Sequence, residues 1–329
     1  MNLRRKSRVM KKVIISALII LLGCVSTMAA DLIIQSDTQS YDEADNKVKA
    51  EGNVVVELED GKVMGDKADV TVTDDNKLDV ATFYDNPYAV QVKGFKKREV
   101  KANILKVSLI NKVVTAQGNV QATVFDGEDP IVVITSDTQE YATDNNQMTA
   151  EGNVIIKYKE LETLSDKAII KTDKSGELEK IDLIGNAKLK QDKQRSSADY
   201  FVYSAATQEL IAKGNVVSEA ELDDGSPLLL KSNYQEYNQD SNTFLASGNT
   251  KIWFKDYFAE GPKAVFYPDK NTKKPNEIFF FGRSAITQDV KTIYADKIKL
   301  ILKPKTFYAE GNTKTVIRDI GKNTDKEMF

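Results

Sequence analysis

Cysteine and histidine are almost absent from this chain of 329 residues. The sequence contains one cysteine, Cys24, and no histidine. After residue 30, disulfides, thiolate nucleophiles, histidine metal sites and Ser-His-Asp catalysis are therefore excluded. Carboxylates remain, but they are spread through turns and alternating segments, with no calcium-binding loop and no phosphate-binding glycine loop. We therefore expect no enzyme activity, no cofactor and no metal site.

Long hydrophobic runs are also absent, except near the N-terminus. Residues 13–25 form an apolar run that follows a group of basic residues and precedes the small residues Ala29 and Ala30. This order predicts a secretory signal peptide over residues 1–30, and the run is shorter than the roughly 20 residues that span a bilayer. We expect an exported protein. Cleavage near Ala29 or Ala30, lipidation of Cys24 in the sequence LLGC, and an uncleaved inner-membrane anchor all stay open.

Basic residues do not outnumber acidic ones either. Six of the 46 Lys and Arg residues lie in the first thirty positions, which leaves 40 basic residues against 49 acidic ones, a net charge of −9. Nucleic acid is a poor partner for such an acidic chain. We therefore expect no nucleic-acid binding.

The feature that stands out is a Gly-Asn dipeptide that recurs along the chain. Two altered versions, Asp85-Asn86 and Gly282-Arg283, lie in the remaining gaps, and successive sites are 29 to 34 residues apart. A fixed period near thirty residues predicts stacked supersecondary units. The glycines of the seven unaltered sites are Gly52, Gly118, Gly152, Gly185, Gly214, Gly248 and Gly311.

A second, longer period groups these sites in threes. The sequences SDTQSY at Ser36, SDTQEY at Ser136 and SNYQEY at Ser232 open three copies of a unit of about 97 residues. Each copy holds three Gly-Asn-type sites, and the middle site is the most altered. We expect one continuous domain over residues 31–329, with copies at about 31–132, 133–230 and 231–318 and a polar tail at 319–329.

Apolar and polar residues alternate on both sides of each Gly-Asn site. In KAEGNVVVEL the even positions are apolar and the odd ones are largely polar, which is the period of a strand with one buried face. The alternation passes through Gly-Asn without changing face, so we expect these residues to bend a strand rather than reverse it. Each would be a crease where the strand passes from one sheet to a facing sheet.

The creases predict which side chains point inward. By parity, the inward residues after the creases share one apolar interior, which we call the groove. These residues are Val54, Val56, Leu58, Val120, Val154, Ile156, Val216, Ile252 and Phe254.

The order of these motifs resembles the LptA/OstA family of lipopolysaccharide-transport proteins. The resemblance rests on the segment AEGNVVVELEDGKVMGDKADVTV, in which Gly-Asn, an alternating strand, a turn and Gly-Asp-Lys follow one another. The same order returns in AEGNVIIKYKELETLSDKAII, and YADKIKL at Tyr294 matches the second half of this pattern. The resemblance implies an all-β, elongated, open β-jelly roll, in which two antiparallel sheets form a V. It further implies that the groove residues named above bind lipid, because the apolar interior of this fold holds acyl chains. It also implies a bridge or carrier across the periplasm in outer-membrane biogenesis.

The expected partners follow from this resemblance. They are lipopolysaccharide or another acylated lipid, other jelly-roll transport proteins at the inner and outer membranes, and further copies of the chain joined head to tail through edge strands. The alternative is a secreted structural repeat protein that assembles through sheet edges without lipid. The sequence leaves open which lipid is carried, the polarity between membranes and the oligomeric state.

Overall fold

A computed structural model of the chain describes residues 33–318, with gaps at 59–60, 74–77, 94–95, 109, 143, 175–176, 223, 270–274 and 303. The expected all-β fold is confirmed: these residues form antiparallel strands and, within the described ranges, no helix. The chain divides into two compact units, residues 1–185 and 186–329. The predicted signal peptide, Cys24 and the tail at 319–329 lie outside the described residues.

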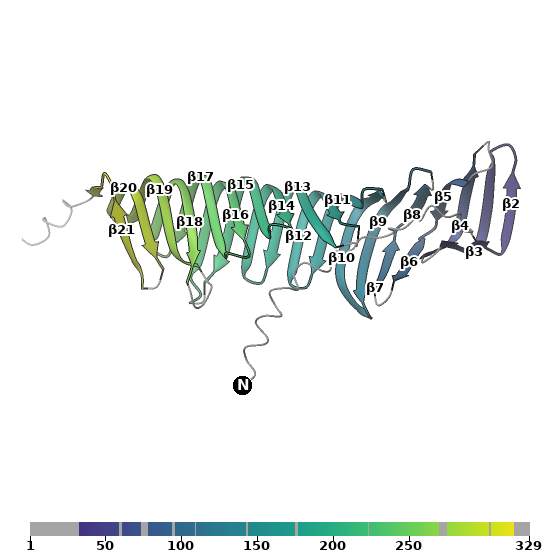
Figure 1. Cartoon of the computed structure of the whole chain (residues 1–329), viewed down its shortest axis with the longest axis horizontal. Coiled ribbons are helices and arrows are strands. Elements are labelled where there is room, and N and C mark those ends of the chain that lie inside the picture. The colour runs from purple at the N-terminus through teal and green to yellow at the C-terminus, as the bar shows by residue number, and fades with distance from the viewer. Residues whose placement is uncertain are drawn as a thin grey trace, which may run out of the picture. The chain divides into compact units, whose positions relative to one another are not determined.

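Unit 1 consists of antiparallel strands joined by short connections (Figure 1). These strands are rich in valine, isoleucine and threonine, which favour a pleated, half-buried surface. Its strands are β1 (Ile33–Gln35), β2 (Thr38–Asp42), β3 (Lys47–Leu58), β4 (Gly61–Val72), β5 (Leu78–Tyr84), β6 (Tyr88–Lys93), β7 (Lys96–Lys101), β8 (Ile104–Ser108), β9 (Val113–Asp126), β10 (Asp129–Ala142), β11 (Gln147–Tyr158) and β12 (Leu161–Thr172).

The division between the units falls within β13 (Leu178–Gln191). Unit 2 continues with β14 (Gln194–Ser204), β15 (Glu209–Glu221), β16 (Pro227–Asn238), β17 (Thr243–Phe254), β18 (Tyr257–Pro268), β19 (Pro275–Gln288), β20 (Lys291–Ile301), β21 (Thr306–Glu310) and β22 (Lys314–Ile317). The predicted boundaries of the three sequence copies stay a prediction.

The strands of unit 1 form two layers, because the short strands next to β3 and β9 each pair with only one side of a crease, whereas the long strands continue through both layers. Layer one contains β2, β5, β8 and the halves of β3, β9 and β11 that precede Gly-Asn; layer two contains β1, β6, β7 and the halves that follow it. The first strand shows the principle: β2 pairs with residues 47–51 of β3, whereas β1 pairs with residues 55–57. The chain therefore passes from one layer to the other at each crease.

Unit 2 has the same arrangement and ends in the same way. β21 pairs with residues 297–301 of β20, and β22 pairs with residues 291–294. Tyr257, in layer two, packs edge-to-face on Phe307, in layer one, with 6.2 Å between ring centroids. The two layers of unit 2 therefore face each other across a shared apolar core, which includes Ile252, Phe254, Phe280, Ile298 and Leu300.

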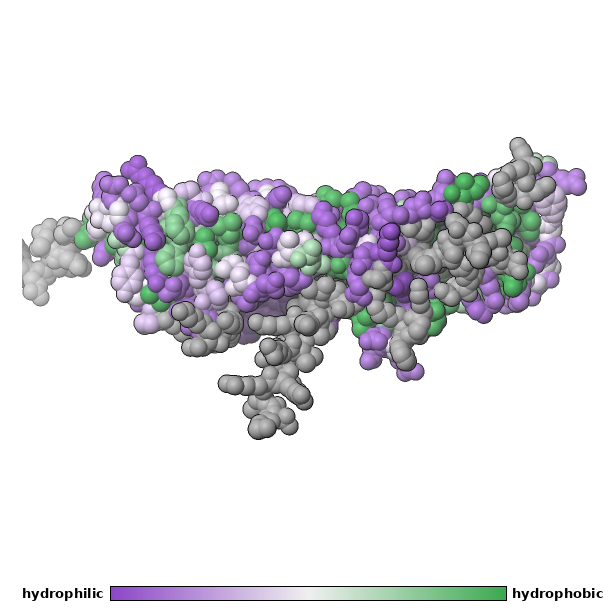
Figure 2. Space-filling view, viewed as in Figure 1, coloured by the Kyte–Doolittle hydropathy of each residue, from purple (hydrophilic) through white to green (hydrophobic). Residues whose placement is uncertain are grey.

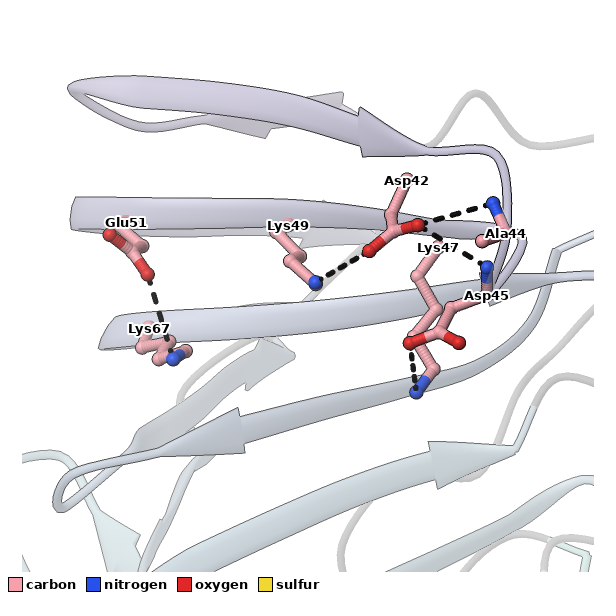
Figure 3. Close-up of polar contacts among 7 residues, drawn as sticks. All are labelled: Asp42, Ala44, Asp45, Lys47, Lys49, Glu51 and Lys67. Carbon is pink, nitrogen blue, oxygen red and sulfur yellow. Dashed lines mark hydrogen bonds and ion pairs between the residues drawn. The ribbon is translucent and has the colours of Figure 1, made fainter.

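The outward faces are mostly hydrophilic, as Figure 2 shows for one side. Lysines and carboxylates form ion pairs across neighbouring strands, such as Lys67 with Glu51 at 3.5 Å (Figure 3). At the turn after β2, Asp42 accepts hydrogen bonds from Lys49 Nζ at 2.9 Å and from two backbone amides. The bond from Lys49, followed by the amide of Asp45, lowers the pKa of Asp42. Such exposed pairs add little stability, but they keep the outer face polar.

Candidate functional site

The predicted groove residues point into the space between the layers. Eight of the nine have side chains that are at most 4% exposed: Val54, Val56, Val120, Val154, Ile156, Val216, Ile252 and Phe254. The side chain of the ninth, Leu58, lies outside the described residues. In both units, parity thus places these side chains on the inner face. Lipid binding at them stays a prediction.

The inner face is lined by small side chains next to the creases on one layer. Ala50, Ala150 and Ala246 each stand two residues before a crease glycine and are at most 1% exposed. On the other layer, Val54 and Val154 stand two residues after it and are equally buried. Because alanine occupies little space, the two layers can converge at the crease and separate away from it. Larger residues such as Met148 and Ile156 fill the wider part.

The Gly-Asn residues adopt a left-handed backbone conformation at every unaltered site. In β11, Gly152 has φ of 77° and Asn153 has φ of 49°. Glu151 pairs with Lys167 and Val154 pairs with Ser165, so Gly152 and Asn153 together stand opposite the single residue Asp166. Two residues opposite one is a β-bulge, which bends a strand without ending it. Glycine meets the positive φ at little cost, and asparagine tolerates it better than other residues.

Sequence reasoning missed the second half of each crease, which is an aspartate or asparagine on a neighbouring strand or in the break between two neighbouring strands. A Cβ added to any of the seven glycines would lie 2.1 to 2.9 Å from that side chain. The glycine is thus required by close packing as well as by φ. The partners, in the order of the seven glycines, are Asp37, Asn103, Asp137, Asp166, Asp199, Asn233 and Asp296.

In at least five of the seven sites, the asparagine that follows the glycine donates a hydrogen bond to the same partner. Asn153 Nδ2 donates to Asp137 Oδ2 at 3.1 Å, and Asn312 Nδ2 donates to Asp296 Oδ2 at 2.7 Å. These partners are exposed on the outer side of the bend. The signal was present in the sequence, because a small residue precedes each partner, as in Ser136-Asp137, and the partner stands 15 residues before the glycine in six of the seven sites.

Serine and glutamine bond to backbone carbonyls at the corners that open the first two copies. In the second copy, Ser136 Oγ donates to the carbonyl of Thr138 at 3.0 Å, and Gln139 Nε2 donates to the carbonyl of Ile134 at 3.2 Å. Ser136 and Gln139 are both 6% exposed. The motif SDTQ therefore supplies three contacts at one bend: serine and glutamine inside, and aspartate outside.

In unit 2 the corresponding glutamine joins the two layers. Gln235, in layer one, accepts a hydrogen bond from Ser218 Oγ, in layer two, at 2.5 Å. Gln235 is 3% exposed and its Nε2 atom has no hydrogen-bond partner among the described residues. The interior is thus largely apolar but carries a few buried polar groups.

The altered middle crease of the first copy interrupts its strands. Asp85 and Asn86 have φ of 63° and 61°, and β5 stops before them while β6 begins after Pro87. Next to this break, unit 1 has a polar cleft of about 640 Å³ on its outer side. It is lined by Asn86, Tyr88, Glu99, Lys101, Ala102, Asn103 and Asn119. None of the predicted groove residues lines this cleft.

Charged residues join the layers of unit 2 at the side away from the creases. Lys305, in the turn before β21, forms an ion pair with Asp256, in the turn before β18, and its Nζ lies 4.2 Å from the ring centroid of Tyr257. Gln288 Nε2 donates to Asp256 at 2.6 Å. The hydrogen bond from Lys305, followed by that from Gln288, lowers the pKa of Asp256 to about 2.

A match to a family model supports the predicted family resemblance. Residues 133–228 match a family model described as LptA/(LptD N-terminal domain) LPS transport protein. One similar solved structure is that of LptH, described as the LptA homologous periplasmic component of the conserved lipopolysaccharide transport device from Pseudomonas aeruginosa. The alignment covers 37% of this chain and 82% of that chain, with 14% sequence identity and a TM-score of 0.33. No curated protein matches the sequence. Within the described ranges, no helix is long and apolar enough to span a bilayer. The predicted LptA/OstA-like resemblance is confirmed.

Proposed function

Since residues 133–228 match the LptA/LptD N-terminal family of lipopolysaccharide-transport proteins, we propose that this chain binds the acyl chains of lipopolysaccharide or a similar amphiphile between its two layers. It carries the lipid through the periplasm toward the outer membrane. The observation that carries this proposal is the apolar inner face in each unit, where the eight described groove side chains are at most 4% exposed.

The physical basis is the burial of hydrocarbon. Each methylene moved from water to an apolar surface contributes about 0.8 kcal/mol, and such contacts tolerate movement along the surface because they have no direction. In unit 2 the inner side chains pack against each other across the layers. Lipid entry therefore requires the layers to part on the side away from the creases, as a hinge opens. Binding and release need no chemical step, so the chain acts as a carrier and not as an enzyme.

The direct test is extraction of lipid from the purified chain that follows the predicted signal peptide. Organic extracts analysed by mass spectrometry should contain acylated lipid in a fixed ratio to protein. A matched extract of Ile156→Asp should contain less, because a carboxylate on the inner face repels hydrocarbon, whereas Lys157→Asp on the outer face should retain it. Protein without lipid under both native and reconstituted conditions would favour the structural alternative.

We propose that edge strands join this chain to its partners in transport. β22 is paired to β20, and Ile317 and Tyr308 at this end are 51% and 61% exposed. An unpaired strand edge recruits further strands. Small-angle scattering over a range of concentrations should therefore show end-to-end growth, which proline at Thr315 and Ile317 should abolish. Growth that persists in this double variant would exclude pairing through β22.

A further inference from the structure

An arginine and a glutamine interrupt the apolar inner face of unit 1. Arg98 in β7 pairs with Gln91 in β6 on one side and with Val124 in β9 on the other. Cross-strand partners share a face of the sheet, and Gln91 and Val124 are both 7% exposed. The next residue in the strand, Glu99, points the other way, where it pairs with Lys97. The side chain of Arg98, which is itself partly buried, is therefore directed toward the interior.

The guanidinium is held in place within this interior. Arg98 Nη1 donates to Gln91 Oε1 at 3.3 Å. Tyr141, from the facing layer, is close enough to interact with it electrostatically, and burial lowers the pKa of Arg98. Arginine nevertheless stays protonated at neutral pH. A positive charge thus lies between the layers of unit 1, beside the inward residues Val100 and Val124.

This position differs from those of the other arginines. Four arginines follow residue 30, and Arg195, Arg283 and Arg318 are exposed. Lysine supplies the other basic residues. Moving a charge away from water is costly, and an apolar residue of similar size would fill this place at lower cost. Arginine is also the side chain best suited to bind a phosphate or carboxylate through two hydrogen bonds at once.

We propose that Arg98 and Gln91 form a binding site for the anionic head group of an amphiphile whose chains lie along the inner face of unit 1. This inference rests on the proposed function, because it assigns a head-group contact to the same interior. Val100, Val124 and Val132 on the same layer contact the hydrocarbon next to the head group. The site makes the carrier selective for charged amphiphiles, a property that apolar side chains cannot supply.

The test compares two ligands that share a chain and differ in charge. Calorimetry on the full mature chain should show that dodecyl phosphate binds at least tenfold more tightly than dodecan-1-ol, on the scale of a charge-assisted hydrogen bond. Arg98→Met should remove most of this preference, because it weakens the binding of dodecyl phosphate far more than that of dodecan-1-ol. Arg195→Met, an exposed control, should keep the preference, and thermal melting should show that both variants fold.

The outcomes separate this site from the proposed function. If the wild-type chain binds both ligands and Arg98→Met binds them as the wild type does, the head-group site is wrong and lipid binding stands. If inorganic phosphate binds as tightly as dodecyl phosphate, the site recognises a free anion and the amphiphile assignment is wrong. If the wild-type chain binds neither ligand, the proposed function fails together with the site.

Discussion

The crease in β11 and the altered crease between β5 and β6 make the same change of layer by different means. In β11 the strand is continuous through Gly152 and Asn153. In the altered crease the chain leaves the strand at Tyr84 and resumes it at Tyr88, although Asp85 and Asn86 also have positive φ. The left-handed conformation alone is therefore insufficient to keep the strand intact.

Glycine makes the difference because it lets the neighbouring strand approach. At Gly152 the carboxylate of Asp137 occupies the space where a Cβ would lie, at 2.1 Å. Asp85 has a Cβ, so no partner can take that place, and proline at position 87 removes a backbone donor. The strands separate locally, and the polar cleft of unit 1 lies beside this break. Close packing around glycine thus keeps a strand continuous as it bends.

Replacing the crease glycine should have the largest effect. Gly152→Val should lower the free energy of unfolding by about 3 kcal/mol or more, because valine combines an unfavourable positive φ with a clash against Asp137. Urea denaturation followed by circular dichroism measures the change. Gly225→Val is the matched control, since Gly225 has the same φ of 77° but no atom within 4 Å of an added Cβ.

The clash can be separated from the backbone strain. In a Gly152→Ala variant, a second change, Asp137→Gly, removes the side chain that the new methyl group would meet. The two costs should therefore be non-additive, with the double variant more stable than the sum of the single effects by about 1 kcal/mol. Two results together would show that close packing is unimportant at the crease. Gly152→Val and Gly225→Val would lower the free energy of unfolding equally, and the effects of Gly152→Ala and Asp137→Gly would be additive.

Installing glycine in the altered crease should produce a smaller effect of opposite sign. Asp85→Gly restores a Gly-Asn pair and should stabilise the chain by about 0.5 to 1 kcal/mol, because glycine accepts positive φ without strain. Asp192→Gly is the matched control, because Asp192 also has a positive φ, 49°, but lies in a turn between strands. This change relieves backbone strain without altering a crease. If Asp85→Gly stabilises the chain no more than Asp192→Gly does, repair of the corner contributes nothing.

The smallest expected effect concerns ionisation beside the altered crease. Burial, followed by a hydrogen bond to Glu99 and the charge of that carboxylate, raises the pKa of Tyr88. The unfolded chain releases a tyrosine proton near pH 10, whereas the folded chain retains it to higher pH. The stabilising contribution is therefore complete below about pH 10 and is lost as pH rises toward the folded pKa. Absorbance titration should show one fewer late-ionising tyrosine in Tyr88→Phe, and an unchanged titration curve would contradict the assignment.

The sequence predicted the inner face better than the corners. Alternation was sufficient to place Val54 and Ile156 inside, because a strand has a period of two. The partner of each crease glycine was not predicted, because its position depends on strand length and register: Asp137 precedes Gly152 by 15 residues, but Asp166 precedes Gly185 by 19. Arg98 was also missed, since the breaks at residues 85–87 and 102–103 interrupt the alternation that would have placed it inside.

The central claim, that alternate residues after each crease face a bound lipid, can be tested by site-specific photo-crosslinking. A photoreactive residue at Ile156, which is 4% exposed, should capture lipid in cells, whereas the same residue at the exposed neighbour Lys157 should not. Mass spectrometry of the crosslinked protein identifies the adduct. Capture at Ile156 alone is the result that the account predicts, and equal capture at both positions, or capture at Lys157 alone, would contradict it.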